Sequence, residues 1–382
     1  MSKNKEIYDV IIIGGGIVGC SAAYFLAKYG IRSLVLERDT VAGHASGFAL
    51  GSLNPLVGYG VPDLVLDYGL KSFQLHSSLS SDLLEETGID TEYDVQPTIN
   101  LAMTKDEAID LQLQTNWQNK VKGFKSEWFS SEEMLKIEPR ISSKIYGGSI
   151  IQGSVMLDPY KLTLGLLTSA EKKGAEIKYS EVIKVKSQSS GNIIITTKTE
   201  TFNTNRVIFA MGPWTQFVSD WIGTKVPVEP LRGQIIKLKI DAPHINYINW
   251  SHSYVSSKPD GMVWIGTTTE KVGFDERVTF EARNNMIEDV TSVFSYLQDA
   301  EMTGHTACLR PLSADGIPII GYGKDNKNYV LVTGGGKKGI LYGPYLGKLA
   351  AQLTLGKTPT MDISPLRPDR NYALNNDNEE VY

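Results

Sequence analysis

The sequence predicts an α/β fold of two domains, in which an open parallel sheet is followed by a second, α+β region. Three observations support this fold class. Residues 8–13 and 33–37 are continuous apolar runs joined by a helical segment over residues 16–29, as in a βαβ unit. From residue 175 onward, the chain becomes rich in predicted strands, and the one over residues 192–199 is rich in β-branched residues. Residues 329–333 form another apolar run, which turns through glycines into a helix ending near residue 355.

The segments between these landmarks alternate between helix and strand. Helices are predicted over residues 64–87 and 105–121, with a strand over residues 98–103 between them. Ser130 and Glu133 form a capping box before a short helix. Asp158 followed by Pro159 predicts the start of a helix that reaches residue 173. The remaining predicted elements are strands over residues 177–186, 192–199, 206–210, 234–240, 252–256 and 262–267, and a helix over residues 280–296.

Composition excludes several classes of protein. The net charge is -5 and the basic residues are scattered, so we expect no nucleic-acid partner. The two cysteines, Cys20 and Cys308, do not suggest a disulfide scaffold and fit a reducing cytoplasm. Residues 10–27 carry no charge, but they contain four glycines. We therefore interpret them as strand, turn and helix rather than as a membrane span.

A glycine-rich turn follows the first predicted strand. Gly14, Gly16 and Gly19 form a GxGxxG pattern that opens the first predicted helix. The first glycine permits a tight turn, the second lets a pyrophosphate approach the backbone, and the third allows close helix–strand packing. Glu37 ends the next strand, where a carboxylate can accept hydrogen bonds from both hydroxyls of a ribose without a 2′-phosphate. The turn therefore predicts a dinucleotide site.

Two later segments favour FAD over NAD as this dinucleotide. The strand near residue 207 ends at Ala210 and Gly212, just before Trp214, and resembles the segment that returns to the nucleotide in flavoproteins of the two-dinucleotide-binding type. The glycine-rich residues 334–340 again join a strand to a helix. A helix N-terminus aimed at an isoalloxazine ring stabilises the negative charge that develops near N1 and O2 of the reduced ring.

Taken in order, these positions resemble the D-amino-acid oxidase (DAO) superfamily, in particular its glycine oxidase and sarcosine oxidase members. Further markers are the His44-Ala45-Ser46-Gly47 stretch, residues 230–234, Leu309-Arg310-Pro311 and residues 315–321. The resemblance implies a discontinuous FAD-binding, Rossmann-like domain over residues 1–80, 150–225 and 300–370. It implies a mostly antiparallel substrate-binding domain over residues 81–149 and 226–299, and a C-terminal tail over residues 371–382.

The resemblance also implies a substrate site. Arg310 matches an arginine that binds the substrate carboxylate, and a planar guanidinium suits bidentate pairing with that group. Tyr254 matches a tyrosine that helps to hold the same carboxylate. An ion pair between loops and a tyrosine at a domain boundary are the structural alternatives. The implied reaction is hydride transfer from the α-carbon of glycine, sarcosine or a D-amino acid to flavin N5, followed by imine hydrolysis. We assign no side-chain base and expect no metal.

The expected FAD contacts come from both glycine-rich loops and the segments between them. Non-covalent binding is the first expectation, and a covalent link through His44 or Cys308 is the alternative, because related enzymes tether FAD near these positions. The full set is Gly14, Gly16, Ile17, Val18, Gly19, Glu37, Arg38, His44, Ala45, Ser46, Gly51, Leu53, Val182, Ala210, Gly212, Trp214, Arg310, Gly335, Gly336, Lys337, Lys338, Gly339 and Ile340.

The electron acceptor stays open between O2 and a partner protein. Trp264 stands where sarcosine oxidase carries a lysine thought to promote the reaction with oxygen. A flavoprotein subunit of a dye- or quinone-linked dehydrogenase, of the proline or dimethylglycine type, is therefore the main alternative, with homo- or hetero-oligomers both open. The oxidase domain of a tRNA-modification enzyme is a further resemblance, and the acidic charge opposes it. A non-catalytic flavin-binding protein is the third hypothesis.

Overall fold

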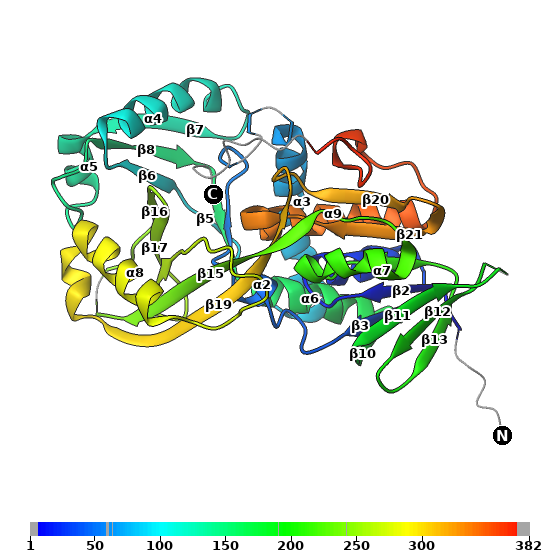
Figure 1. Cartoon of the computed structure of the whole chain (residues 1–382). Coiled ribbons are helices and arrows are strands. Elements are labelled where there is room, and N and C mark those ends of the chain that lie inside the picture. Colours follow the sequence, from blue (N-terminus) through cyan, green and yellow to red (C-terminus); the bar gives the residue numbers. More distant parts are fainter. Residues whose placement is uncertain (1–6, 59–60, 63, 190, 242, 373–382) are drawn as a thin grey trace.

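The computed structural model describes residues 7–58, 61–62, 64–189, 191–241 and 243–372, so most of the predicted tail lies outside the described residues. Over the described residues, the strands form four sheets, of which two are large (Figure 1). One large sheet is nearly all parallel and the other is mostly antiparallel. The predicted α/β fold with a second, mostly antiparallel sheet is thus confirmed.

The parallel sheet has the order β10-β3-β2-β14-β21-β20, in which only β20 runs antiparallel to its neighbour. Side chains of β2 alternate between its faces, as strand geometry requires. Val10 and Ile12 join the core on the helical side, whereas Ile11 and Ile13 join the core on the opposite side. The strands are β2 (Val10–Ile13), β3 (Ser33–Glu37), β10 (Glu176–Tyr179), β14 (Val207–Phe209), β20 (Ile319–Gly323) and β21 (Asn326–Thr333).

Three helices pack on one face of this sheet, namely α1 (Ile17–Lys28), α6 (Pro159–Lys172) and α9 (Gly339–Thr354), and α3 (Leu66–Thr87) packs on α6 and α9. Helices α1 and α9 lie in unusually close contact. A Cβ atom on Gly343 would lie 2.7 Å from Ile17 Cγ2, and one on Gly347 would lie 2.4 Å from Ser21 Cβ. Any larger residue at either glycine would therefore force the two helices apart.

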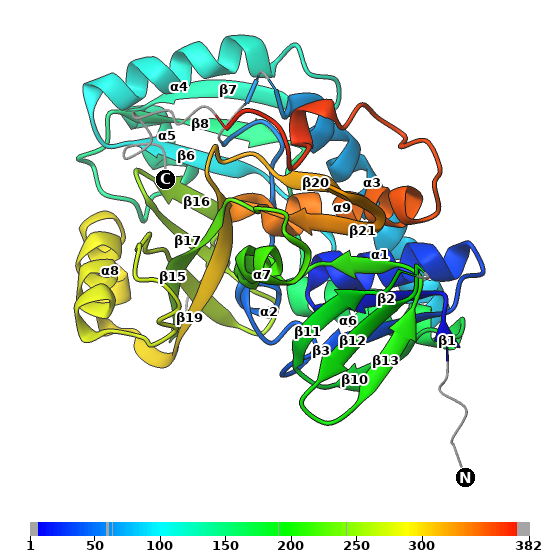
Figure 2. The same cartoon turned by 45° about the vertical axis from the view of Figure 1, so that its right-hand side comes forward.

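A four-stranded sheet covers the opposite face, with β11, β12 and β13 side by side in Figure 2. Its strands are β1 (Ile7–Tyr8), β11 (Val182–Ser187), β12 (Ile193–Thr197) and β13 (Thr201–Thr204). The small third sheet contains β4 (Ser52–Leu53), β5 (Asp94–Val95) and β9 (Val155–Met156).

The eight-stranded sheet lies beside this layered unit (Figure 1). Helices α4 (Lys105–Gln118), α5 (Ser131–Ile137) and α8 (Phe280–Val293) pack against it. On β6, Ile99 and Leu101 enter the core, while Thr98 and Asn100 line a large cavity on the other face. In sheet order, the strands are β19 (Glu301–Ser313), β15 (Val228–Lys239), β18 (Met262–Gly266), β17 (Ser253–Ser257), β16 (Tyr247–Trp250), β6 (Thr98–Ala102), β8 (Gly147–Gln152) and β7 (Lys125–Ser130).

Local signals in the sequence were mostly reliable. The capping box at Ser130 and Glu133 is present, and the Asp158 side chain accepts from Lys161 N at the start of α6. The single strand predicted over residues 177–186 is wrong, because the chain leaves the parallel sheet at Ser180, whose N–H bonds to Glu37 O at 2.7 Å. Its two halves are β10 and β11, which belong to different sheets. The long strand β19 was not predicted.

We propose that the two large sheets mark the two domains, with the FAD-binding part over residues 1–80, 150–225 and 300–370. Strand β19 then connects the two parts, because it lies in that range but pairs with β15 of the eight-stranded sheet. Its register places Arg310 opposite Leu231 and Cys308 opposite Gly233. The backbone around Arg310 is thereby held by β15, which belongs to the proposed substrate-binding part.

Candidate active site

A cavity of about 1820 Å³ lies where the two large sheets meet. Ile13, Glu37, Ala210 and Thr333, at or just after the carboxyl ends of β2, β3, β14 and β21, line one side of it. Ligands of open α/β sheets bind at this edge. Pockets for drug-sized molecules enclose roughly 300–1,000 Å³, so this cavity has room for a dinucleotide and a small second molecule.

The first glycine-rich turn brings backbone N–H groups to the cavity. Gly14, Gly16, Ile17 and Val18 line it, and Gly16 begins α1 without a side-chain cap. The first-turn amides of a helix lack partners inside the helix and favour an anion. Gly19 lies outside the lining. A Cβ atom there would lie 1.9 Å from Gly14 O, so Gly19 acts through close packing of α1 on the turn.

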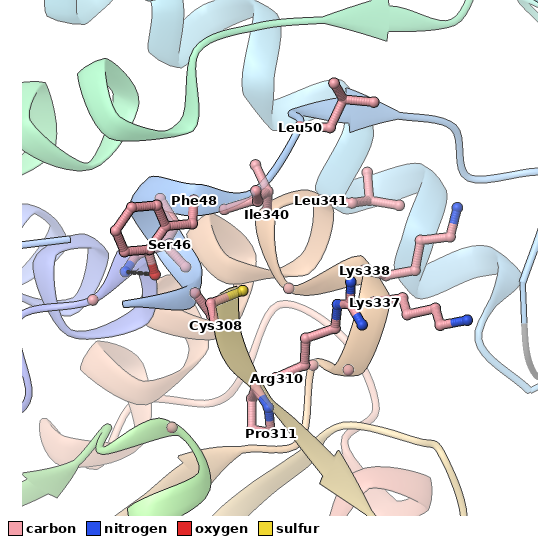
Figure 3. Close-up of a pocket in the computed structure, with 18 of the residues that line it drawn as sticks. Ser46, Phe48, Leu50, Cys308, Arg310, Pro311, Lys337, Lys338, Ile340 and Leu341 are labelled. Carbon is pink, nitrogen blue, oxygen red and sulfur yellow. Dashed lines mark hydrogen bonds between the residues drawn. The ribbon is translucent and has the colours of Figure 1, made fainter. Parts of the chain in front are cut away.

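Ser46 lies against this turn. Its Oγ accepts a hydrogen bond of 2.9 Å from Ile17 N, drawn as a dashed line in Figure 3. The short helix α2 (Ala45–Phe48) holds Ser46 there, and Ala45 and Gly51 also line the cavity. Leu53 does not, because it is fully buried in the core on the helical side of the parallel sheet.

The carboxylate of Glu37 is buried at the end of β3. It accepts hydrogen bonds from Gly15 N at 2.6 Å and from Asp39 N at 2.8 Å. Each carboxylate oxygen can accept a further bond, so the group can still bind ribose hydroxyls. Val182 lines the same cavity from the start of β11.

Arg38, His44 and Trp214 form a cluster beside Glu37. The Arg38 guanidinium lies 4.5 Å from the Trp214 ring centroid, a cation–π distance. Both ring nitrogens of His44 lie 2.9 Å from carboxylate oxygens, those of Asp39 and Glu276. The three side chains and Gly212 belong to the lining.

The second glycine-rich loop enters the cavity with two lysines. Gly335, Gly336, Gly339 and Ile340 line it together with Lys337 and Lys338, in the short 3-10 helix η3 (Gly336–Lys338) and the start of α9. Burial lowers the pKa of Lys338 to about 8. Burial and the nearby charge of Arg310 lower the pKa of Lys337 to about 8. Lys338 Nζ donates to Asn54 O at 3.1 Å.

Helix α3 anchors the start of α9. Ser72 Oγ and His76 Nε2 both donate to Leu341 O, at 2.6 and 3.0 Å. Because α9 contains Pro344, which has no N–H, its first turns lack part of their internal hydrogen bonding. Burial lowers the pKa of His76 to about 4, so the imidazole is neutral at neutral pH. The side chains of α3 thus hold the helix end that faces the cavity.

Arg310 and Tyr254 line the cavity from the eight-stranded sheet. The Arg310 guanidinium donates to Thr268 O at 3.1 Å and to Thr267 Oγ1 at 2.6 Å, and it extends toward the lysine loop in Figure 3. A Cβ atom on Gly233 would lie 1.9 Å from Arg310 Nη2, so only glycine leaves room for the guanidinium. Burial raises the pKa of the Tyr254 hydroxyl, which keeps it a hydrogen-bond donor.

Several residues that shape the site were not predicted. Thr267 positions Arg310, and Lys258 is buried with its Nζ donating to Leu50 O at 3.0 Å and Leu157 O at 2.9 Å. These bonds fix the cavity wall at Leu50. No local pattern in the sequence could identify them, because their partners are far away along the chain. Asn54, whose backbone oxygen accepts from Lys338, lies a few residues after the His44-Ala45-Ser46-Gly47 marker. Its position in the sequence could therefore have identified it as a residue of the cavity.

The residues of the cavity fit FAD. The α1 turn offers amides to a pyrophosphate, Glu37 offers a carboxylate to a ribose, and the α9 loop offers positive charge to the other end of an extended ligand. Among the described residues, no group of His, Cys, Asp and Glu side chains could hold a metal ion. In the same part of the chain, no helix combines the length and the apolar character needed to cross a membrane.

Comparisons with known proteins agree with this fit. The family model "DAO: FAD dependent oxidoreductase" matches residues 9–353. Glycine oxidase from Geobacillus kaustophilus is 28% identical, covering 94% of this chain and 96% of that protein. A hydrogen cyanide synthase subunit from Pseudomonas aeruginosa is 25% identical, covering 94% and 95%. The crystal structure of glycine oxidase from Geobacillus kaustophilus matches with a TM-score of 0.92 at 27% identity, covering 96% of this chain and 100% of that one. The chain therefore belongs to the DAO family of FAD dependent oxidoreductases and is an enzyme.

Proposed function

We propose that the enzyme oxidises the carbon–nitrogen bond of a small amino acid or an N-substituted glycine, such as glycine, sarcosine or a D-amino acid. The observation that carries this proposal is the Arg310 guanidinium. It lines the cavity, is held by Thr267 and Thr268, and has no carboxylate partner among the described residues. A half-buried guanidinium without a counter-charge favours an anionic ligand. The similar proteins named glycine oxidase support an amino acid as this ligand.

In the proposed mechanism, the chain binds and orients the substrate. Arg310 pairs with the substrate carboxylate, and the Tyr254 hydroxyl donates a second hydrogen bond to it. Thr267 restricts the guanidinium to one position, which sets the α-carbon relative to the cofactor. When bound, FAD supplies a hydride acceptor. We assign no side-chain base, because the amine can bind in its neutral form.

We propose that FAD binds without a covalent link, through the residues expected from the sequence other than Lys337, which we assign to the substrate, and with Gly19 and Leu53 acting by packing. Both ring nitrogens of His44 already have carboxylate partners. Burial raises the pKa of the Cys308 thiol, which disfavours the nucleophilic thiolate. Acid precipitation of the holoenzyme should give a colourless pellet and a yellow supernatant. A yellow pellet would contradict this proposal.

The proposed reaction is tested by anaerobic mixing of the FAD-loaded protein with glycine, sarcosine, proline and both enantiomers of several amino acids. At least one should bleach the flavin absorbance near its visible maximum. Arg310→Met should weaken the apparent affinity for that substrate by about 100-fold or more, since truncating one partner of a buried charge pair costs 2–5 kcal/mol. Arg367→Met is the matched control, because Arg367 is exposed and lies outside the cavity lining. Equal affinities in the wild type and Arg310→Met would refute the carboxylate role.

A dehydrogenase that passes electrons to a partner is the second candidate. The similarity to a protein named as a subunit of hydrogen cyanide synthase favours it. The substrate-reduced enzyme should reoxidise within seconds in air if O2 is the acceptor. Slow reoxidation that is accelerated by an artificial quinone would instead support the partner-dependent function. We propose a cytoplasmic location, because Cys20 and Cys308 are both free thiols and buried. Cell fractionation tests this location.

A further inference from the structure

Three cations meet at one end of the cavity. Arg310, Lys337 and Lys338 all line it, and strand β19, which carries Arg310, contacts the 3-10 helix η3, which carries the lysines. Figure 3 shows the three side chains near one another, with both lysine side chains extending away from the Arg310 guanidinium. None of them forms an ion pair with a carboxylate in the described part of the chain. This end of the cavity therefore holds an excess of positive charge that the protein leaves unbalanced.

The three cations differ in how far their donors are occupied. Arg310 donates to Thr267 and Thr268, and Lys338 donates to Asn54 O. Lys337 has no hydrogen bond or ion pair within the residues that the structure describes. Its side chain is accessible from the cavity that it lines, while the surrounding protein withdraws it in part from bulk water. All three ammonium donors of Lys337 are thus directed to water or to a ligand.

Acidic residues of the cavity do not offset this charge. Glu37 bonds to the backbone beside the first glycine-rich turn, and Glu181 pairs with Lys198. Glu107 caps α4 and accepts from Ser251. Asp110 lines the cavity from α4 and forms no ion pair with any of the three cations. A substrate with one carboxylate would neutralise one of the three cations, and a cation held away from bulk water without a partner is costly.

We propose that Lys337 binds a second anionic group of the substrate, so that the physiological substrate is a dicarboxylic amine, namely an N-(carboxyalkyl)glycine or an acidic amino acid. The inference rests on the proposed function, in which Arg310 binds the first carboxylate. In this arrangement, Arg310 fixes the carboxylate next to the reacting carbon, and Lys337 selects for the charge at the far end. Two carboxylates bring the number of anions closer to the number of cations.

A matched pair of unreactive ligands tests this inference. Oxydiacetate and methoxyacetate are ether analogues with two and one carboxylates, and neither has an amine to oxidise. Each is titrated into the FAD-loaded protein and followed by the perturbation of the visible flavin spectrum. The wild type should bind oxydiacetate about ten-fold or more tightly than methoxyacetate, because the additional charge pair is partly withdrawn from water. Lys337→Met should abolish the preference and leave methoxyacetate binding unchanged.

Two variants make the result specific. Lys348→Met removes a lysine of the adjoining helix α9 that lies outside the cavity lining, and it should keep the wild-type preference. Lys337→Gln replaces the ammonium by a polar group and serves if Lys337→Met folds poorly; it should also lose the preference. Flavin reduction potentials of the wild type and Lys337→Met are measured in parallel. A changed potential with an unchanged preference for oxydiacetate would overturn the proposal, because Lys337 would then serve the flavin.

Failure of this inference differs from failure of the proposed function. Equal affinities of the wild type for the two ligands would refute the second anion site. Both ligands would then still lose affinity in Arg310→Met, and the carboxylate role of Arg310 would stand. If neither ligand bound, or if Arg310→Met bound both as tightly as the wild type, the proposed function itself would be wrong, and with it the assignment of Lys337.

Discussion

Residues 14–19 and residues 334–339 both connect a strand of the parallel sheet to a helix that begins at the cavity, yet they present different chemistry to it. The strands β2 and β21 lie on either side of β14. The first turn presents backbone amides of uncharged residues, and the second adds Lys337 and Lys338. The first therefore suits the pyrophosphate that all FAD proteins share, and the second suits groups that vary with the reaction.

Glycine is required for different reasons in the two loops. A Cβ atom on Gly14 would lie 2.3 Å from Ala210 O, so packing within the protein demands glycine there. Cβ atoms on Gly336 and Gly339 would meet no described atom within 4 Å. The first loop is fixed by its contacts with neighbouring backbone, whereas the second borders open space in which a ligand can lie. Substitutions in the two loops should separate these roles.

The largest expected effect is the loss of FAD binding in Gly19→Ala. The new Cβ atom would lie 1.9 Å from Gly14 O, which forces the α1 turn to move. FAD affinity, measured by fluorescence quenching on titration, should fall by more than about 100-fold, the effect of several displaced hydrogen bonds to a charged ligand. Gly339→Ala in the second loop has a helical backbone with φ -53 and free space, so we expect a loss of about ten-fold or less. Equal losses would remove the distinction between the loops.

A second expected effect is a loss of stability to unfolding at acidic pH. It involves the second loop alone, through His76. His76 anchors the start of α9, and its pKa is about 4 in the folded protein, against 6.5 for an ordinary histidine. Between these values, the unfolded state binds the proton and the folded state does not. Stability is therefore full above about pH 6.5 and is lost as the pH falls toward 4, by up to about 3 kcal/mol.

Urea unfolding at pH 7 and pH 4.5, with fixed excess FAD, measures this loss. His76→Gln removes the titrating group, and it should lose about 2–3 kcal/mol less than the wild type between the two pH values. His252→Gln is the control, because His252 is exposed. If His76→Gln retained the full pH dependence of the wild type, other groups would be responsible for it.

A third effect should leave both loops intact and act at the eight-stranded sheet, next to the end of β18. Thr267→Val keeps the shape of the side chain but removes the oxygen that accepts from Arg310. We expect KM for the substrate to rise about ten-fold, in line with one hydrogen bond to a charged group. FAD affinity should stay within two-fold, roughly the scatter of a neutral substitution. A parallel fall in FAD affinity would show that the eight-stranded sheet also supports FAD binding.

The smallest expected effect is that of Tyr254→Phe. The hydroxyl contributes one hydrogen bond to the carboxylate in our proposal, and the buried ring stays in place. A loss of roughly three- to ten-fold in kcat/KM is expected from a single neutral donor. An unchanged kcat/KM would reduce Tyr254 to a packing role in the cavity wall.

The nucleotide end could be predicted from the sequence because its signals are local. Gly14, Gly16 and Glu37 lie within one βαβ unit, so spacing alone places them at one edge of the sheet. Arg310 came from a motif shared with a known family. Its orientation was beyond prediction, since it depends on the pairing of β19 with β15 and on the space left by Gly233.

Other features could not be found because they depend on contacts between distant segments. The break at Ser180 could not be predicted, because the sequence of residues 177–186 does not reveal which sheet each half of the segment joins. Leu53 was expected among the FAD contacts, but its side chain lies in the core on the helical side of the parallel sheet. Lys258 fixes the cavity wall by donating to Leu50 O and Leu157 O, and this role depends on the fold bringing these two distant residues together.

The close contact between α1 and α9 at Gly343 and Gly347 has a mechanical consequence. Two helices packed this closely, with glycines of α9 against Ile17 and Ser21 of α1, cannot slide or tilt independently, because interiors at this density do not compress. Thermal displacement of one helix end is therefore transmitted to the other, so the loop of residues 14–19 and the loop of residues 334–339 keep a constant separation. An opening of the cavity to admit substrate must then take place across the seam between the two large sheets, with the nucleotide end moving as a rigid unit.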